Sequence, residues 1–377
     1  MLIHSCEGEE SLLPGFVLHG LKANAPCMIV QDTSIGIFRD GSFGIKHQSA
    51  SVLENDWSRM SCRELMLDFF VDCTAPVCKG EECIEISVCD YFETYWDAGW
   101  YLKDFHFVRE MVRLNVDMVY STPLCFQDDW LNWWCWDRYD SLKDDCNDYR
   151  FMYCGPKGSM TPLHHDVLMS FSWSTNVIGS KLWILFPPKF KAILKKVHLI
   201  PSLQSMVVDC FENDGVLADF EKIVFEVLDS VYGLKGERPT VVLQRAGDTI
   251  FVPSEWFHQV HNLSDCLSIN HNWFNRWNLS MVHSYLLEEF SATKAAISDC
   301  KTESGFDTEW EGVLCQKIMK LNVGVNLHEW FQLLVAKFES TENDKEYIIN
   351  AVSDLEKKHP DLYSYFLSVT SLKDLLV

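Results

Sequence analysis

Short runs of β-branched and aromatic residues dominate the chain between Arg150 and Phe274. Turns that contain glycine or proline separate these runs, which read RFMYCGPKG, LMSFSWSTNVIG, SKLWILFPP, TVVLQRAGD, TIFVPSEW, FHQVHNLSD and CLSINHNWF. Several short strands at regular spacing are typical of a β-barrel or a jelly roll. We therefore predict a mainly β domain with helices at its flanks.

Helical patterns interrupt this β-type region once and follow it to the end of the chain. Residues 189–238 contain KFKAILKKVHLI and FEKIVFEVLDSVYGL, which favour a helical insert between two strands. After Trp277, apolar residues recur at helical spacing in MVHSYLLEEF, EWFQLLVAKF and YIINAVSDLEKKH. We predict an N-terminal α/β region that packs on the barrel (1–100), a β domain (101–277) and a C-terminal helical region (278–377).

The balance of charges limits the partners of this chain. Its 377 residues carry 32 basic and 54 acidic side chains, for a net charge of −22. Phosphate backbones need a concentrated basic surface, so we expect no direct binding of nucleic acid, and an acidic surface favours basic partners. No uncharged apolar stretch reaches the roughly 18 residues of a membrane span. We expect no membrane association, and the C-terminal helices are candidates for a homodimer interface.

The cysteine pattern indicates the redox compartment. The chain has 15 cysteines, an odd number, and none forms a CxxC pair, so zinc-finger spacing is absent. The first residues, MLIHSCEGEESLLPGF, lack the basic and apolar segments of a secretory signal. We expect free thiols in a reducing compartment, the cytoplasm, with the nucleus as a second location.

The stretch MTPLHHD predicts two metal ligands. On an extended backbone, residues i and i+2 project to the same face, so His164 and Asp166 are able to converge on one cation. A third ligand must come from another strand. We favour His258, which directly follows the turn PSEWF, and keep His261 and His271 as rivals.

Two histidines and one carboxylate on one face are the ligand set of non-haem iron(II) oxygenases. Each of these residues alone is more often an ordinary core or surface side chain. Their combination in one predicted barrel favours a metal site formed by His164, Asp166 and His258, which are also the candidate catalytic residues.

Four further residues are candidates for binding an organic co-substrate. Lys181 begins the strand KLWILF, and an inward ammonium in an apolar barrel needs an anion, such as the far carboxylate of 2-oxoglutarate. Thr161 and Tyr101 offer hydroxyl groups to the same carboxylate, and Asn272 is placed to orient the metal ligands. The alternatives are an edge lysine for Lys181, a turn residue for Thr161, a core aromatic residue for Tyr101 and a cross-strand hydrogen bond for Asn272.

A Trp-rich acidic segment is a second candidate surface. Asp128 and Asp129 stand beside Trp130, Trp133 and Trp134 and are able to receive a basic peptide, since a cation over an indole face is favourable. The alternative is a packed helix face with solvated acids.

The order and spacing of TPLHHD, SFSWSTNVIGSKLWILFPP and GDTIFVPSEWFHQVHNLSDCLSINHNWFN resemble the JmjC pattern. Within that class the chain is similar to the Jumonji domain-containing protein 4 family, on the stretches YLKDFHF, DDWLN, DYRFMYCGP, SFSWSTNV and SINHNW. The resemblance covers about residues 65–290. It implies a double-stranded β-helix of the jelly-roll, cupin-like kind.

The resemblance also implies an activity. It implies iron(II), 2-oxoglutarate and O2 as cofactor and co-substrates, and hydroxylation of a lysyl side-chain carbon in the eukaryotic peptide chain release factor. It implies that His164, Asp166 and His258 bind the metal. It implies that Lys181, Thr161, Tyr101 and Asn272 contact the co-substrate or orient the metal ligands. The rival functions are a JmjC lysine demethylase, a non-catalytic JmjC scaffold and a cupin isomerase that does not need 2-oxoglutarate.

Overall fold

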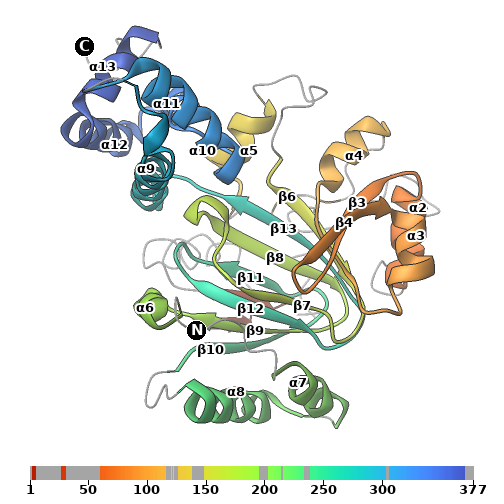
Figure 1. Ribbon diagram of the computed structural model, residues 1–377. Coiled ribbons are helices and arrows are strands. Elements are labelled where there is room, and N and C mark those ends of the chain that lie inside the picture. Colours follow the sequence, from red (N-terminus) through yellow and green to blue (C-terminus); the bar gives the residue numbers. More distant parts are fainter. Residues whose placement is uncertain are drawn as a thin grey trace. The chain divides into compact units, whose positions relative to one another are not determined.

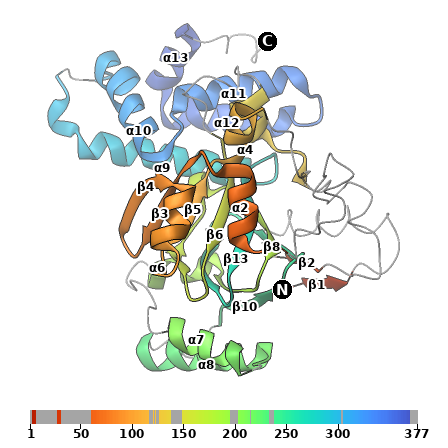
Figure 2. The same ribbon diagram turned by 90° about the vertical axis from the view of Figure 1, so that its right-hand side faces the viewer.

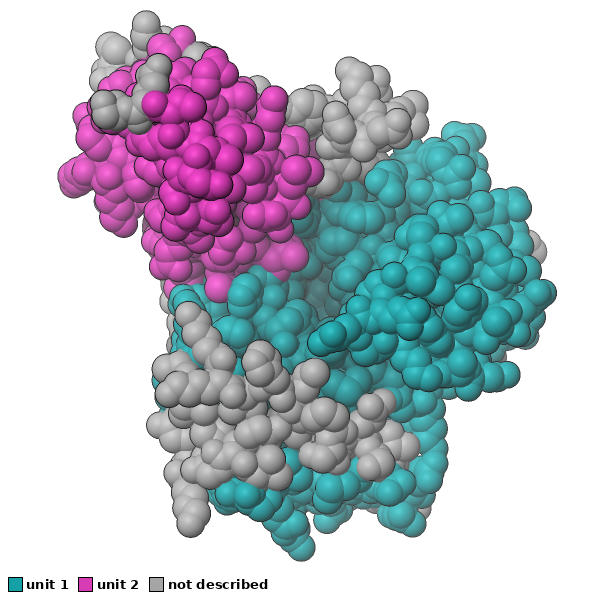
Figure 3. Space-filling view, viewed as in Figure 1, with its two compact units in different colours: residues 1–127, 140–166, 171–272 teal, residues 128–139, 167–170, 273–377 magenta. Residues whose placement is uncertain are grey.

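The computed structural model describes residues 2–5, 27–30, 60–115, 120, 122, 126–137, 148–194, 203–213, 215–232, 238–302 and 305–369. The rest of the predicted N-terminal region before residue 60 lies outside this described part. The chain divides into two compact units (Figure 3). The first unit comprises residues 1–127, 140–166 and 171–272, and the second comprises residues 128–139, 167–170 and 273–377.

Two β-sheets form the framework of the first unit (Figure 1). The larger sheet has the strand order β1-β2-β11-β8-β13-β6-β5-β3-β4, and the smaller has the order β10-β9-β12-β7. β1 and β2 run parallel, whereas the pairs around the site described below are antiparallel. The strands span Leu2–Ser5 (β1), Cys27–Val30 (β2), Thr74–Lys79 (β3), Glu82–Ser87 (β4), Tyr101–Phe105 (β5), Arg150–Gly155 (β6), Met160–His164 (β7), Phe171–Ile178 (β8), Lys181–Phe186 (β9), Thr240–Gln244 (β10), Thr249–Val252 (β11), Phe257–Asn262 (β12) and Cys266–Trp273 (β13).

Strand β9 shows why the smaller sheet is buried on both faces. Leu182, Ile184 and Phe186 pack into one apolar cluster with side chains of helix α8 (Leu217–Tyr232). Trp183 and Leu185 pack into another cluster with residues of β10, β11 and β12. A strand covered on both faces loses the alternation of polar and apolar residues. Antiparallel sheets with apolar layers and flanking helices confirm the predicted mainly β, jelly-roll fold class.

Helices between β9 and β10 cover the outer face of the smaller sheet. In α8, Phe220, Val224 and Leu228 are buried at helical spacing and pack in the same cluster as β9. α7 and α8 lie side by side beyond β10 in both ribbon views (Figures 1 and 2). The elements of this segment are η7 (Pro188–Phe190), α6 (Lys191–Leu194), α7 (Leu203–Glu212) and α8 (Leu217–Tyr232).

Helix α2 (Cys62–Phe70) packs close to strand β5. It begins with a capping box, in which the Ser61 side chain and the Glu64 side chain each bond the other residue's backbone N–H. Its buried face includes Phe70, whose ring meets the ring of Phe105 edge-on at 5.1 Å. The other helices of the first unit are α3 (Val88–Asp90), η3 (Tyr91–Tyr95) and α4 (Phe107–Arg113).

The expectation that all thiols are free is wrong for one pair. Cys78 and Cys83 lie directly opposite each other in the β3–β4 hairpin and form a disulfide, with their Cα atoms 4.1 Å apart. Sequence spacing does not predict this bond, because only the register of the hairpin makes the two residues opposite. The free cysteines of the described part include Cys62, Cys73, Cys89, Cys154, Cys210, Cys266, Cys300 and Cys315.

The second unit is helical. Its core includes one face of α11 (Leu327–Ser340), where Leu327, Trp330, Phe331 and Leu334 are at most 1% exposed. No helix in the described part of the chain is both long enough and apolar enough to cross a membrane. The elements are α5 (Trp130–Asn132), η5 (Trp133–Asp137), η6 (Val167–Met169), α9 (Leu279–Ala296), η8 (Ser298–Cys300), η9 (Thr308–Leu314), α10 (Cys315–Val323), α11 (Leu327–Ser340), α12 (Lys345–Lys358) and α13 (Pro360–Val369).

Candidate metal centre

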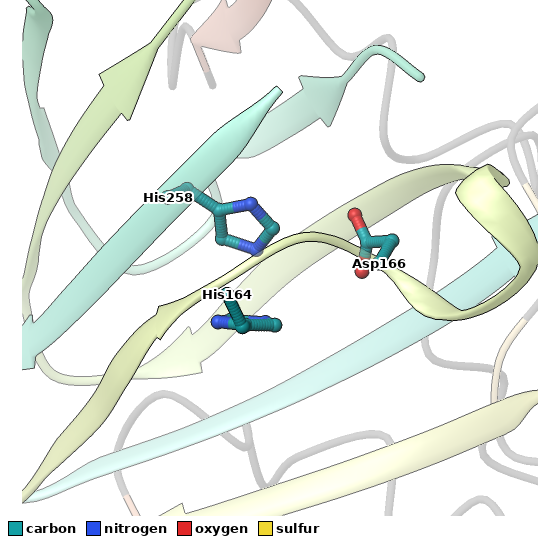
Figure 4. A group of neighbouring side chains, drawn as sticks. All are labelled: His164, Asp166 and His258. Carbon is teal, nitrogen blue, oxygen red and sulfur yellow. The ribbon is translucent and has the colours of Figure 1, made fainter. Parts of the chain in front are cut away.

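His164, Asp166 and His258 meet at one point of the first unit (Figure 4). Each offers one ligand atom, and these atoms all lie within 4.8 Å of one another. His164 ends β7, Asp166 follows two residues later, and His258 lies near the start of β12. The two histidines are direct partners in the antiparallel pairing of β7 with β12, and their ring centroids are 4.2 Å apart. Tertiary pairing therefore brings the three predicted ligands together.

Backbone carbonyls fix the orientation of both imidazole rings. Nδ1 of His164 lies 2.8 Å from the carbonyl oxygen of Pro162, and Nδ1 of His258 lies 3.2 Å from that of Trp256. A carbonyl only accepts, so each Nδ1 carries a hydrogen, and in the neutral form of each ring Nε2 keeps a lone pair. A metal ion binds a neutral imidazole through such a lone pair.

The electrostatic surroundings keep His164 neutral. Desolvation and the neighbouring His258 lower the pKa of His164 to about 3, although Asp166 opposes both effects. Binding of a metal requires a deprotonated imidazole, so this ring needs to release no proton at neutral pH.

Two polar side chains hold the Asp166 carboxylate. Asn272 donates from Nδ2 to Oδ1 at 2.9 Å, and Ser172 donates from Oγ to Oδ2 at 2.8 Å. Such contacts orient a ligating carboxylate and tune its affinity for the ion. The sequence predicts a role of this kind for Asn272 but misses Ser172, whose place beside Asp166 depends on the chain turning back into β8.

The rival histidines have other partners. His261 lies on the opposite face of β12 from His258, and its Nε2 is 3.0 Å from Nε2 of the Gln259 side chain. His271 lies on the opposite face of β13 from Asn272, and its Nε2 is 2.6 Å from the hydroxyl of Tyr120. Neither joins the cluster of ligand atoms. Strand alternation therefore separates His258 from both rivals.

Lys181 points into a pocket beside the metal ligands. The residue is 2% exposed, and its Nζ donates to Ser268 Oγ at 2.7 Å and to Tyr101 Oη at 3.3 Å. Within the described part of the chain, no carboxylate lies within ion-pair distance of this ammonium. Burial lowers the pKa of Lys181 to about 8. A buried cation without an anionic partner predicts an anionic ligand.

The same pocket contains the other predicted co-substrate residues. Its lining is mostly polar and draws on both sheets, with Tyr101, Tyr153, Thr161, His164, Asp166, Ser172, Lys181, Trp183, His258, Val260, Asn270 and Asn272. Burial raises the pKa of Tyr101, and the polar side chains of Asn262 and Thr161 oppose the rise. The phenol of Tyr101 is therefore protonated and able to donate. The sequence missed Tyr153, which only the pairing of β5 with β6 brings to this pocket.

The Trp-rich segment has a structural role in the second unit. Asp128 accepts from Trp130 Nε1 at 2.9 Å and from Asn275 Nδ2 at 3.2 Å, and Asp129 accepts from the backbone N–H of Asn132 at 2.9 Å. The Lys337 ammonium lies over the rings of Trp130 and Trp133, at 5.0 and 5.1 Å from their centroids. A lysine of the chain itself thus occupies the indole faces, and the packed-helix alternative fits the contacts better than a peptide site.

Comparison with known proteins places the three candidate metal ligands within a known domain. Residues 151–273 match the protein family described as JmjC domain, hydroxylase. Arginine-specific demethylase JMJ20 of Arabidopsis thaliana is 34% identical over 318 residues, which cover 79% of this chain and 61% of that protein.

Further relatives carry the name 2-oxoglutarate and iron-dependent oxygenase JMJD4. The protein from Danio rerio is 38% identical over 62% of this chain and 49% of its own length. The protein from Homo sapiens is 37% identical over 65% of this chain and 54% of its own length. The chain thus spans about half to three fifths of the length of these relatives. Residues 151–273 therefore form a JmjC domain, which contains the two-histidine, one-carboxylate cluster, and the sequence of the chain is similar to those of JMJD4 proteins.

Proposed function

We propose that this chain is an iron(II)- and 2-oxoglutarate-dependent oxygenase that hydroxylates a lysyl side-chain carbon of a protein. The observation that carries the proposal is the convergence of His164, Asp166 and His258 beside the buried ammonium of Lys181. One group of side chains fits a divalent ion, and the other fits the far carboxylate of a dicarboxylic acid. The family resemblance makes the eukaryotic peptide chain release factor the proposed substrate, with translation termination in the cytoplasm as its setting.

The donor set fits ferrous iron. Two neutral imidazoles with free Nε2 atoms and one carboxylate leave positions open for exogenous ligands, as in non-haem iron(II) oxygenases. When bound, iron and 2-oxoglutarate supply the oxidation: O2 gives one oxygen atom to the C–H bond and one to succinate, with release of carbon dioxide.

The side chains of the pocket bind and orient these groups. Lys181 neutralises the far carboxylate, while the hydroxyls of Tyr101, Thr161 and Ser268 offer it hydrogen bonds. Asn272 and Ser172 keep the Asp166 carboxylate facing the ion. Trp183, stacked on His258 with ring centroids 5.6 Å apart, limits the access of water on that side. Holding the reacting groups in place is the main work left to the protein.

Mass spectrometry tests the reaction. The release factor is incubated with the chain, iron(II), 2-oxoglutarate and air, and we expect the mass of one oxygen atom to be added at one lysine, with an equal amount of succinate. Loss of methyl groups from a methylated arginine or lysine, with no added oxygen, would instead favour a demethylase, the activity named in the JMJ20 relative. No succinate with any protein substrate would favour the scaffold.

Asn272→Ala should weaken the metal site without removing a ligand. Because Asn272 Nδ2 holds Asp166 Oδ1, we expect the affinity for iron(II) to fall by about tenfold to a hundredfold. Anaerobic titration of the protein with iron(II) measures the change. Asn213→Ala, at an exposed asparagine after α7, is the control and should bind iron(II) like the wild type. Equal affinities for the two variants would refute the supporting role of Asn272.

The pKa of Lys181 predicts how 2-oxoglutarate binding depends on pH. Below pH 8 the ammonium form dominates in the ligand-free pocket, and binding takes up no proton at this residue. Above pH 8 binding of the dianion must first protonate the amine, so Kd should rise by up to about tenfold per pH unit. Calorimetric titrations from pH 7 to pH 9.5 measure this slope. A Kd that stays constant across this range would show that Lys181 does not bind the carboxylate as an ammonium.

A further inference from the structure

An irregularity in strand β5 changes the direction of one acidic side chain. Leu102 pairs with Cys154 and Phe105 pairs with Met152, so two residues of β5, Lys103 and Asp104, stand opposite one residue of β6. Asp104 has a positive φ of 56°, a conformation that aspartate tolerates better than most residues. Bulges of this kind redirect side chains and are frequent beside active sites.

The residue opposite this bulge connects it to the candidate pocket. The hydroxyl of Tyr153 donates to Oδ1 of Asp104, and the Tyr153 ring lines the pocket together with His164 and Lys181. Burial raises the pKa of Tyr153, and the carboxylates of Asp104 and Asp166 add to the rise, Asp104 more strongly. The phenol thus bonds the outer carboxylate of Asp104 and lines the same pocket as the metal-centre carboxylate of Asp166.

The outer carboxylate has capacity for another partner. Asp104 is exposed, and among the described residues no lysine, arginine or histidine nitrogen forms an ion pair with it. Its described hydrogen bond is the one from Tyr153. A carboxylate has several acceptor positions, so one phenol leaves room for a cationic donor. Asp104 does not itself line the pocket, but its exposed carboxylate bonds the hydroxyl of Tyr153, which does. A substrate side chain that reaches this hydroxyl therefore comes within reach of the carboxylate.

We propose that Asp104 is a specificity-determining residue that binds the positively charged end of the substrate side chain beside Tyr153. The proposal rests on the proposed function and adds to it the residue that selects a basic substrate. The charge of the chain agrees with it, since a net charge of −22 favours basic partners over acidic ones. The adjacent Lys103 does not neutralise Asp104, because the two form no ion pair.

The test compares Asp104→Asn with the matched variant Asp97→Asn, at an exposed aspartate in the turn before β5. With the release factor as substrate, we expect KM to rise about tenfold in Asp104→Asn, the usual effect of losing one charge-assisted hydrogen bond, with kcat nearly unchanged. Asp97→Asn should keep the wild-type KM. Slow turnover of 2-oxoglutarate without protein substrate should be equal in the wild type and in Asp97→Asn.

A pair of small probes separates recognition of charge from a structural role. Nα-acetyl-lysine methylamide should stimulate turnover of 2-oxoglutarate more than the norleucine analogue, which has a similar shape and no charge. Asp104→Asn should lose this preference, while Tyr153→Phe, which keeps the carboxylate, should retain it.

Two results would overturn the proposal. One is an unchanged preference for the lysine probe in Asp104→Asn. The other is an equal loss of this preference in Asp104→Asn and Tyr153→Phe, which would mean that Asp104 only positions Tyr153. Failure of the proposed function would look different, because the wild-type protein itself would then not turn over 2-oxoglutarate.

Discussion

His164→Ala and Asp166→Ala should each abolish binding of iron(II) and formation of succinate. Each substitution removes one of three donors whose atoms lie within 4.8 Å of one another, and the two that remain do not form a closed site. Anaerobic titration with iron(II) measures binding, and succinate formation with the release factor present measures turnover. We expect both signals to fall to the level seen without protein.

His165→Ala is the matched control for these variants. His165 lies between the two proposed ligands in sequence, but its ring packs edge-on against Phe257, and its Nδ1 lies 3.0 Å from the backbone oxygen of Asp166. It is not part of the cluster of ligand atoms. The control should keep its metal and most of its activity. If His165→Ala lost iron binding and His164→Ala retained it, His165 rather than His164 would be the ligand, and the proposed metal site would be refuted.

Lys181→Met should separate binding of the co-substrate from stability. The substitution removes the only cation that lines the described pocket apart from its histidines, so the affinity for 2-oxoglutarate should fall about a hundredfold, as for truncation of one partner in a buried charge pair. Calorimetry with a redox-inert divalent ion in place of iron measures this loss. Iron(II) binding itself should remain, because the metal ligands are untouched.

The same variant should make the ligand-free protein more stable. Burial lowers the pKa of Lys181 from 10.5 to about 8, and at about 1.4 kcal/mol per pKa unit the desolvated ammonium costs about 3 kcal/mol of folding free energy. Because the folded-state pKa is the lower one, this cost is complete below pH 8 and disappears as the pH rises to 10.5. Lys181→Met should therefore raise Tm at pH 7 and lose this advantage near pH 10.5.

Lys222→Met, at an exposed lysine of α8, should change neither Tm nor the affinity for 2-oxoglutarate. A Tm for Lys181→Met below that of the wild type at pH 7 would mean that the ammonium stabilises the ligand-free fold. In that case Lys181 would be a structural residue, and the argument that it awaits an anion would fail.

Much of the site follows from strand periodicity. The i, i+2 spacing of His164 and Asp166 puts both on one face of an extended segment, and the same alternation turns Lys181 and Trp183 to one face of β9. These contacts are local in sequence, so the residues alone determine them. The fold class has the same origin, since short strands with turn residues between them have few other ways to bury their apolar faces.

The choice among the histidines needed the pairing of distant strands. The sequence favours His258 over His261 and His271 only by its place after the turn PSEWF, whereas the structure pairs His258 with His164 across β7 and β12. Likewise, the bond from Asn272 to Asp166 joins residues 106 positions apart. Register between strands depends on which faces are buried together, and that information is spread over the whole chain.

The features that the sequence analysis did not predict all depend on strand register or on tertiary packing. The hairpin places Cys78 opposite Cys83 and joins them, and Lys337 covers the indoles of Trp130 and Trp133. The sequence by itself determined the strands, the HxD pair and the inward lysine, because backbone geometry repeats every two residues. Only the tertiary structure shows that His258 is paired with His164, that Ser172 holds the Asp166 carboxylate and that Tyr153 bonds Asp104, because these contacts depend on how separate strands align.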